Sequence, residues 1–306
     1  MTATRERGAL RFGLVGTGYW AGRRHAPAIV AAPGAELVAV WGRNAAAADA
    51  LAREHGAIAY TDFEQFLDRV DVLSFSVPPD VQAPLAAVAA RAGKHLLLEK
   101  PIALDLDAGT ELLSCVRDAD VAALVFFTHL FARPIRTWFA EAESSGPWAG
   151  AHAAWLGTAL SEANPYNTPW RRQHGGLWDV GPHAVAGLWR TLGPVTHLSV
   201  DAGERDLTYL VLHHEGGATS SVTLTLSAPD AADGYSLQLW GSAGRSDMPV
   251  DQVDSLQALT VAVTELVDLV ATGARAHPCD LTFGFEVLQV LVRAQHLLDD
   301  RRSDAV

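Results

Sequence analysis

The sequence predicts an α/β protein of two domains: an N-terminal Rossmann domain with a doubly wound parallel sheet, and a C-terminal α+β domain with a largely antiparallel, open sheet. Three observations predict this fold class. Apolar runs alternate with alanine-rich stretches over residues 1–128, a glycine-rich turn follows the first apolar run, and strands of alternating character come after residue 129. The 306 residues, 49% of them hydrophobic, suffice for two cores. We therefore expect domains at residues 1–128 and 129–306.

Short apolar runs predict five strands in the first domain, at residues 10–15, 36–41, 71–77, 95–98 and 121–126. Near-continuous apolarity is typical of strands that are covered on both faces, as in a parallel sheet. Helical composition between the runs predicts helices at residues 44–54, 80–91 and 104–117, with Gly56 and Gly93 as C-terminal stops.

The pattern changes in the second domain. We expect a helix at residues 135–144, strands at 206–213, 219–227 and 235–240, and final helices at 255–271 and 281–298. In the middle strand Val222, Leu224 and Leu226 would face one way, and Ser221, Thr223 and Thr225 the other. This alternation predicts an antiparallel sheet with one face packed on helices.

Composition excludes several classes of partner. The net charge is −12 and the basic residues are scattered, so nucleic acid and anionic membranes are poor partners. Cys115 and Cys279 belong to no cluster with metal-ligand spacing, so we expect reduced, buried thiols and no metal. The N-terminus lacks the apolar core of a signal peptide, and no apolar stretch approaches the ~20 residues of a membrane span. We therefore expect a cytoplasmic protein.

The glycine-rich turn at residues 16–21 predicts a dinucleotide site. Gly16 would make the tight turn after the first strand, Gly18 would leave room for the phosphates, and the small Ala21 would let helix and strand pack closely. Glycine pairs also make ordinary turns, but this one lies at the first strand-to-helix junction, where the fold binds pyrophosphate.

The turn after the second strand bears on the choice of cofactor. It reads Gly42-Arg43-Asn44, without the carboxylate that NAD-preferring domains usually place there. Because an arginine can pair with a 2′-phosphate, the turn favours NADP, with NAD possible. The alternative is that Arg43 is a solvated loop residue and either cofactor binds.

Two further motifs carry candidate chemistry. Glu99-Lys100-Pro101 ends the strand at 95–98, where open parallel sheets place their ligands, although a lone lysine is more often a surface charge. In the stretch from Gly175 to His183, Asp179 and His183 would share one helix face if the helix began near Asp179. Such a pair makes a proton shuttle; the alternative is an aspartate N-cap with an incidental histidine.

These elements, in this order, resemble the Gfo/Idh/MocA oxidoreductases, the group that contains glucose-fructose oxidoreductase and inositol dehydrogenase. The resemblance runs from residue 11 to about residue 298. Besides the glycine-rich turn it rests on Ala92-Gly93-Lys94-His95 before Glu99-Lys100-Pro101, Arg133-Pro134, Trp170-Arg171 before Gly175-Gly176, Asp179-x-Gly181-x-His183, and Leu192-Gly193.

The resemblance implies roles for the motif residues. Lys100 would orient and polarise the substrate oxygen, His183 would act as general acid or base, and Asp179 would bind substrate and tune His183. It also implies a nicotinamide cofactor and a homo-oligomer, a dimer or tetramer, formed through the open sheet face. The expected cofactor contacts are Gly16, Thr17, Gly18, Tyr19, Trp20, Gly42, Arg43, Asn44, Ser76, Pro78, Glu99 and Lys100.

Three residues depart from the family pattern. Pro78-Pro79 stands where Pro-Asn is usual, Gln82 replaces a common histidine, and Ala186 replaces a common aspartate. These differences leave Lys100 and His183 intact and bear on substrate choice more than on chemistry.

Further substrate contacts are expected from His129, which follows the last Rossmann strand, and from Trp170 with Arg171. The alternatives are a polar linker residue and a core tryptophan. Together these features predict an NAD(P)-dependent dehydrogenase or reductase for a secondary alcohol or ketone of a sugar, cyclitol or related polar ring. Two alternatives are a non-catalytic dinucleotide-binding sensor and an NAD-dependent glycoside-cleaving enzyme.

Overall fold

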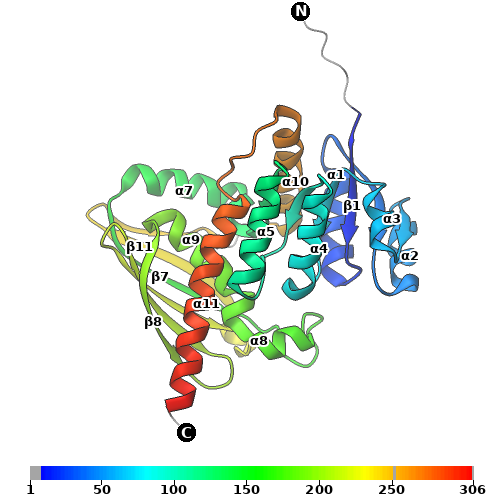
Figure 1. Ribbon diagram of the computed structural model, residues 1–306. Helices are drawn as coiled ribbons and strands as arrows, with labels where there is room; N and C mark the ends of the chain where they lie inside the picture. Colours follow the sequence, from blue (N-terminus) through cyan, green and yellow to red (C-terminus); the bar gives the residue numbers. More distant parts are fainter. Residues whose placement is uncertain (1–7, 251–252, 305–306) are drawn as a thin grey trace, which may run out of the picture. The chain divides into compact units, whose positions relative to one another are not determined.

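The first sheet is parallel throughout, as the apolar runs predict. In the computed structural model, which describes residues 8–250 and 253–304, its strand order is β3-β2-β1-β4-β5-β6. The strands are β1 (Leu10–Val15), β2 (Ala35–Trp41), β3 (Ile58–Tyr60), β4 (Val72–Phe75), β5 (His95–Leu98) and β6 (Ala123–Val125). The order reverses between β4 and β1, the strand that Figure 1 labels in this sheet, and doubly wound sheets bind ligands at such a point.

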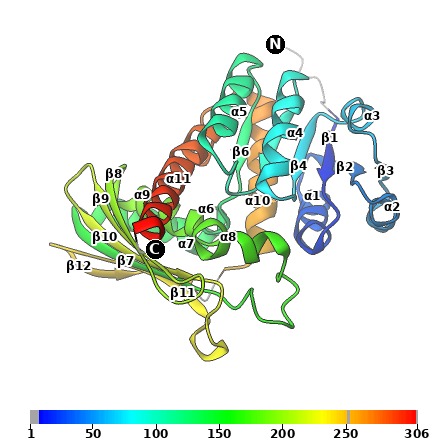
Figure 2. The same ribbon diagram turned by 60° about the horizontal axis from the view of Figure 1, so that its bottom comes forward.

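Helices cover this sheet on both faces, and Figure 2 shows α1 and α4 on opposite sides of it. Phe12, Leu14, Leu73, Leu96 and Leu97 are completely buried, which confirms strands enclosed on both faces. The helices are η1 (Ala21–His25), α1 (Ala26–Ala31), α2 (Ala45–Glu54), α3 (Phe63–Leu67), α4 (Pro79–Arg91), α5 (Leu106–Asp118) and α10 (Ser255–Thr272).

The second sheet has the order β12-β11-β7-β10-β9-β8. Its strands are β7 (Trp148–Leu156), β8 (Val195–Ala202), β9 (Thr208–His214), β10 (Thr219–Thr225), β11 (Gly234–Gly241) and β12 (Gly244–Asp247). Neighbouring strands are antiparallel except β7 and β10, which run parallel. The expectation of a largely antiparallel sheet is confirmed, and the pair of β7 and β10 is its parallel exception.

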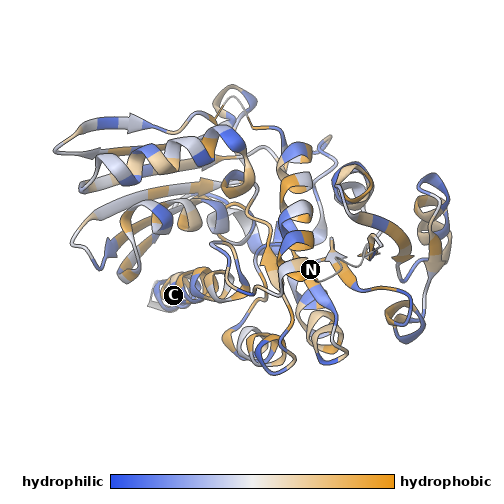
Figure 3. Cartoon of the chain, turned by 90° about the horizontal axis from the view of Figure 1, so that it is seen from above, coloured by the Kyte–Doolittle hydropathy of each residue, from blue (hydrophilic) through white to orange (hydrophobic). Residues whose placement is uncertain are grey.

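One face of the second sheet packs on helices, as the alternation in residues 219–227 predicts, and among the described residues no helix covers the other, which we call the bare face (Figure 2). Leu210, Leu212, Val222 and Leu224 are buried on the packed face. The helices of this part are α6 (Thr128–Phe131), α7 (Arg133–Ser145), α8 (Pro169–Asp179), α9 (Gly181–Leu192), η2 (Asp230–Ala232) and α11 (Leu281–Asp304). Both hydrophobic and hydrophilic residues lie along α11 in Figure 3, as expected of a helix with one buried side.

The chain forms two compact units that are discontinuous in sequence. Unit 1 contains the residues up to Glu99, Thr110–Phe126 and Ser255–Leu281; unit 2 contains Lys100–Gly109, Phe127–Asp254 and the residues from Thr282 onward. This division differs from contiguous domains at 1–128 and 129–306, chiefly because α10 belongs to unit 1. Its buried residues, among them Ala258, Leu259 and Ala262, pack against α1 and the parallel strands.

Among the described residues, α10 is also the one helix whose length and apolar composition would suit a membrane span. A core helix of a folded domain passes the same test, and α10 packs in this way.

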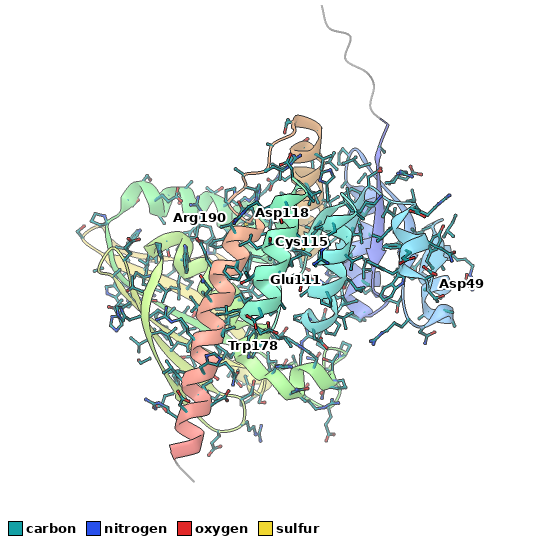
Figure 4. The ribbon with its side chains drawn as sticks, in the orientation of Figure 1. Asp49, Glu111, Cys115, Asp118, Trp178 and Arg190 are labelled. Atoms are coloured by element: carbon teal, nitrogen blue, oxygen red, sulfur yellow. The ribbon has the colours of Figure 1, made fainter. Side chains whose placement is uncertain are left out.

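Side-chain bonds tie helices together within each unit, and Figure 4 labels several of the residues involved. In unit 1, Arg91 of α4 pairs with Glu111 of α5. Cys115 on α5 and Cys279 are buried, and neither forms a disulfide within the described residues. In unit 2, Arg190 of α9 pairs with Glu143 of α7 at 2.7 Å, and the Trp178 indole donates to Gln295 Oε1 of α11 at 2.8 Å.

The helix expected to begin near Asp179 begins later. Asp179 is the last residue of α8, and α9 starts at Gly181 with Pro182 in its first turn. A glycine pair shapes α8: Gly175 has φ +64°, and a Cβ on Gly176 would lie 2.9 Å from the Thr225 backbone. The pair thus brings α8 into close contact with the end of β10.

Candidate functional sites

The glycine-rich turn of unit 1 has the backbone geometry that a dinucleotide needs. Gly16 has φ +121°, and a Cβ there would lie 2.3 Å from the Ser76 carbonyl oxygen. No other residue type fits this position, between the ends of β1 and β4. A Cβ on Gly18 would project into open space, so its backbone is bare and accessible.

The helix that follows the turn contains a π-helical segment, Ala21–His25. Such segments often occur at functional sites because they displace side chains from their usual faces. Just before it, Tyr19 is half-exposed, and the Trp20 indole donates a hydrogen bond to Glu99 Oε1 at 2.8 Å.

The turn after β2 is exposed at Arg43. Gly42 packs against Thr17, because a Cβ on Gly42 would lie 2.6 Å from Thr17 Cγ2. Asn44 caps α2, its Oδ1 accepting from the Ala47 N–H at 3.1 Å. Of the three predicted cofactor contacts in this turn, Gly42, Arg43 and Asn44, only Arg43 has a charged side chain, and it is exposed to solvent.

A buried network holds Glu99 in place at the end of β5. His25 is completely buried; its Nδ1 lies 2.8 Å from Ser74 Oγ and its Nε2 lies 3.1 Å from Glu99 Oε1. The Gln82 amide pairs with both backbone groups of Glu99, each at 2.8 Å. Sequence reasoning missed His25 and Ser74, and the detectable signal was a serine inside the apolar strand β4.

Unit 2 begins with Lys100, which lies in a cluster of charges around Asp179. Lys100 Nζ donates to the Asp179 carbonyl at 2.8 Å and lies 3.5 Å from its Oδ1. Arg171 donates to both carboxylate oxygens, at 2.8 and 3.1 Å. Burial alone would raise the pKa of Asp179, but the two cations outweigh it and lower the pKa below its usual value.

Two histidines of unit 2 lie against each other. The ring centroids of His129, on α6, and His183, in the first turn of α9, are 5.3 Å apart. Both nitrogens of His129 and Nδ1 of His183 are buried without a partner among the described residues. Burial, and then Lys100, lower the pKa of His129 to about 4; burial, Lys100 and His129 lower the pKa of His183 well below 6.5. Both imidazoles are therefore neutral near pH 7.

Aromatic rings complete this region. Trp155 of β7 and Tyr235 of β11 are cross-strand partners whose rings stack at 5.4 Å. The His129 ring lies 5.5 Å from Trp155 and 4.5 Å from Tyr235. Neither residue is among the site residues expected from the sequence. Trp155 lies on β7, which was not expected as a strand, and Tyr235 begins an expected strand without any motif that marks it as functional.

Unit 2 brings some of the predicted site residues together and separates others. Lys100, Asp179 and Arg171 form one cluster, and His129 and His183 are ring neighbours. In the part of the chain that the structure describes, Asp179 makes no hydrogen bond to His183, because its carboxylate is occupied by the two cations. Trp170 lies beside His174 at 5.1 Å, with its indole N–H buried and unpaired. Within the same described ranges no three His, Cys, Asp or Glu side chains are grouped to hold a metal ion.

Comparison with known proteins agrees with the geometry of unit 1. Residues 10–127 match the model of the oxidoreductase family with an NAD-binding Rossmann fold. A dTDP-3,4-didehydro-2,6-dideoxy-α-D-glucose 3-reductase from Streptomyces antibioticus is 33% identical over 123 residues, which are 40% of this chain and 38% of that protein. An inositol 2-dehydrogenase from Rhizobium meliloti is 37% identical over 123 residues, 40% of this chain and 37% of that protein.

The likeness to solved structures covers both units. GenD2 from gentamicin A biosynthesis, solved in complex with NAD, superposes with a TM-score of 0.83 over 98% of this chain and 97% of its own, at 20% identity. That identity shows the shared fold alone. The matched segments of the two curated relatives span little more than a third of their length.

The N-terminal part of the chain, residues 10–127, is thus similar to the NAD-binding Rossmann domain of the Gfo/Idh/MocA oxidoreductase family. The solved structures extend the likeness of fold to the rest of the chain.

Proposed function

We propose that the protein is an NAD(P)-dependent oxidoreductase that transfers a hydride between the nicotinamide and a secondary alcohol or ketone of a sugar, cyclitol or related polar ring. The observation that carries this proposal is the neutral His183 in the same unit as the Lys100–Asp179–Arg171 cluster. The N-terminal part of the chain matches an oxidoreductase family with an NAD-binding Rossmann fold, which supplies the cofactor of the proposal. The two relatives are named for sugar and cyclitol substrates.

The tight turn at Gly16 and the open backbone at Gly18, with Thr17, suit a pyrophosphate. The other expected contacts, Tyr19, Trp20, Ser76, Pro78 and Glu99, lie on the neighbouring turns, helix starts and strand ends. The bound nicotinamide supplies the hydride acceptor or donor. We propose that Arg43 contacts an adenosine 2′-phosphate, which makes NADP the preferred cofactor.

The remaining steps belong to side chains of unit 2. In alcohol oxidation the substrate O–H proton would pass to the neutral His183, which acts as the general base. The Lys100 ammonium stabilises the negative charge that develops on the oxygen. Ketone reduction is the same path in reverse: His183 takes up a proton from solvent and passes it to the substrate oxygen, while the Lys100 ammonium polarises the carbonyl. Asp179 then acts by holding Lys100 and Arg171 rather than by tuning His183.

The test is to mix the protein with NADP or NAD and each member of a panel of sugars and cyclitols. Net reduction of the cofactor is measured as the growing absorbance of NADPH or NADH. We expect turnover with at least one cyclitol or sugar and a preference for NADP. Arg43→Ala should raise the KM for NADP about tenfold and leave the KM for NAD nearly unchanged. A wild-type preference for NAD would contradict the role of Arg43, and no net reduction with any substrate would contradict the function and favour a sensor or a redox-neutral glycoside cleavage.

Two properties of the whole protein belong to the same proposal. The bare face of the second sheet is the surface through which we expect a homo-oligomer to form. The free thiols and the use of a diffusible nicotinamide suit a cytoplasmic location.

A further inference from the structure

Arg171 and Asp179 are in direct contact although they stand eight positions apart along α8. The Arg171 guanidinium donates to both oxygens of the Asp179 carboxylate, at 2.8 and 3.1 Å. In a straight α-helix, eight residues advance about 12 Å along the axis, and a side chain leans toward the N-terminus, away from a partner that comes later. A straight α8 would therefore keep the two groups apart.

A kink inside α8 brings the two residues together. Gly175 has φ +64° and ψ −162°, which interrupts the helix between Arg171 and Asp179. The helix restarts after Gly175, and the first N–H groups of a helical segment have no partner within that segment. The Gly176 N–H has its partner elsewhere in the fold, since it donates to Asp206 Oδ2 at 3.0 Å. Asp206, in the turn before β9, thus caps the second half of α8.

The Asp206 carboxylate is itself held by the end of β10. Its Oδ1 accepts from Thr225 Oγ1 at 2.9 Å, and its Oδ2 accepts from the Leu226 N–H at 2.6 Å. The turn packs tightly on the kink, because a Cβ on Gly175 would lie 2.9 Å from Asp206 Cβ. Arg205, just before Asp206, has φ +59°, a left-handed conformation that persists in a non-glycine residue where surrounding contacts hold it. These contacts fix the carboxylate, and the carboxylate fixes the point where the helix restarts.

We infer that Asp206 is a positioning residue for the reaction at Lys100. Its carboxylate holds the kink, and the kink lets Arg171 take the carboxylate of Asp179. Asp179 then presents its carbonyl to Lys100 Nζ at 2.8 Å. Asp206 acts through this pair rather than on the substrate. The inference rests on the proposed function, in which the Lys100 ammonium stabilises the substrate oxygen.

The first test measures turnover of the sugar or cyclitol that the wild type oxidises. Asp206→Ala should lower kcat about 100-fold, the cost of misplacing a catalytic group by about 1 Å. The KM for NADP should change less than about twofold, because the glycine-rich turn belongs to unit 1. Asp206→Asn should stay within about threefold of the wild type, since its amide oxygen accepts from both N–H groups and its nitrogen donates to Thr225 Oγ1. Asp230→Ala, on the exposed turn η2, is the matched control and should leave kcat unchanged.

A double-mutant cycle separates positioning from general support of the fold. Arg171→Met should lower kcat about tenfold in the wild type and less than about twofold in Asp206→Ala, where the contact with Asp179 is already lost. The same pattern should appear in the midpoint of urea unfolding, which needs no turnover. If Asp206→Ala does not fold, the isosteric Thr225→Val takes its place. It removes one donor to the carboxylate and should lower kcat about fivefold.

Two outcomes would contradict different claims. If the effects of Asp206→Ala and Arg171→Met multiply in kcat and add in the urea midpoint, the inference is overturned and the proposed function stands. If the wild type turns over no sugar or cyclitol, the proposed function falls, and with it the part of Asp206 in a reaction. The urea cycle would still show whether Asp206 holds the Arg171–Asp179 pair.

Discussion

At the scale of single residues, Asp179 organises the charges of unit 2. Its carbonyl and carboxylate contact the Lys100 ammonium, and its two carboxylate oxygens accept bidentate hydrogen bonds from Arg171. A buried carboxylate with two cationic partners is strongly coupled to both, so removing it leaves two cations without a counter-charge. The roles of Lys100 and Asp179 are therefore best separated by changing the lysine.

Lys100→Met should abolish turnover, by at least about 1,000-fold in kcat, because the charge that stabilises the substrate oxygen is lost. Binding of NADPH, measured by fluorescence titration, should change little. Lys94→Met is the matched control, since Lys94 is the only other lysine and its Nζ donates to the Val70 carbonyl. Unchanged turnover in Lys100→Met would contradict the mechanism.

The two neutral histidines predict a pH dependence of stability. Their pKa values are lower in the folded protein than the usual 6.5, so the unfolded chain binds more protons as the pH falls below 6.5. The contribution of these histidines to the free energy of unfolding should therefore have its full value above about pH 6.5. Below that pH it should decline by up to about 1.4 kcal/mol per pH unit for each histidine. For His129, whose pKa is about 4, the decline continues to that pH.

Urea denaturation at about pH 7 and about pH 5 measures this decline, and His129→Phe should be visibly less pH-dependent than the wild type. Asp179 does not affect this measurement. Because its pKa is lowered in the folded protein, its contribution to stability is present above about pH 3.8 and is lost only at lower pH. Identical pH dependence in both proteins would show that His129 is not held neutral.

At the scale of elements, the kink in α8 positions the end of the helix that carries Asp179. The Gly176 N–H donates to Asp206 Oδ2 at 3.0 Å, and the same carboxylate accepts from Thr225 Oγ1 and the Leu226 N–H. Asp206 therefore ties the glycine pair to the end of β10.

Gly176→Ala should destabilise the protein by about 1–3 kcal/mol, because the new methyl group would meet the Thr225 backbone. Since the displaced segment leads to Asp179, kcat should fall as well. Gly216→Ala is the control: its Cβ would meet nothing within 4 Å, so thermal unfolding should be unchanged. A Gly176 variant that melts like the wild type would show that α8 can move away from β10.

The sequence predicts elements well where one pattern dominates. The bounds of β1 and β5 agree with their apolar runs to the residue. The strand β7 was missed because its sequence, WAGAHAAWL, is rich in alanine and glycine and has weak strand propensity. Its conformation depends on β10 and β11, which pair with it on either side and lie far along the chain.

The candidate site was predictable as a set of residues but not as a set of contacts. Lys100, Arg171, Asp179, His129 and His183 were all expected to act. That Asp179 serves Lys100 and Arg171 instead of His183 depends on the helix break after Asp179, which i, i+4 spacing cannot reveal. The network of His25, Ser74 and Glu99 likewise needs the pairing of distant strands.

At the scale of the whole molecule, the bare face of the second sheet carries Tyr209, Val211 and Trp240, which are 44%, 38% and 40% exposed. Exposed large apolar residues on one sheet face are typical of a surface that binds another protein. Within the proposed function, that partner is a second copy of the chain.

The double variant Tyr209→Asp/Trp240→Asp should have a smaller molar mass than the wild type in size-exclusion chromatography with light scattering. Association through this face would bury two charges in the interface, which disfavours it. Val30→Asp is the control, since Val30 is 56% exposed on α1 of unit 1. If the double variant keeps the wild-type mass, the sheet face does not mediate assembly.

The discontinuity of the two units limits how the protein can be dissected. A fragment that stops at residue 128 would keep all strands of the first sheet but lack α10, whose apolar side covers α1. Such a fragment would expose that surface to water and should aggregate on expression. An autonomous nucleotide-binding fragment would need residues 255–281 fused back onto the N-terminal segment, so any exchange of halves between relatives must transplant this helix as well.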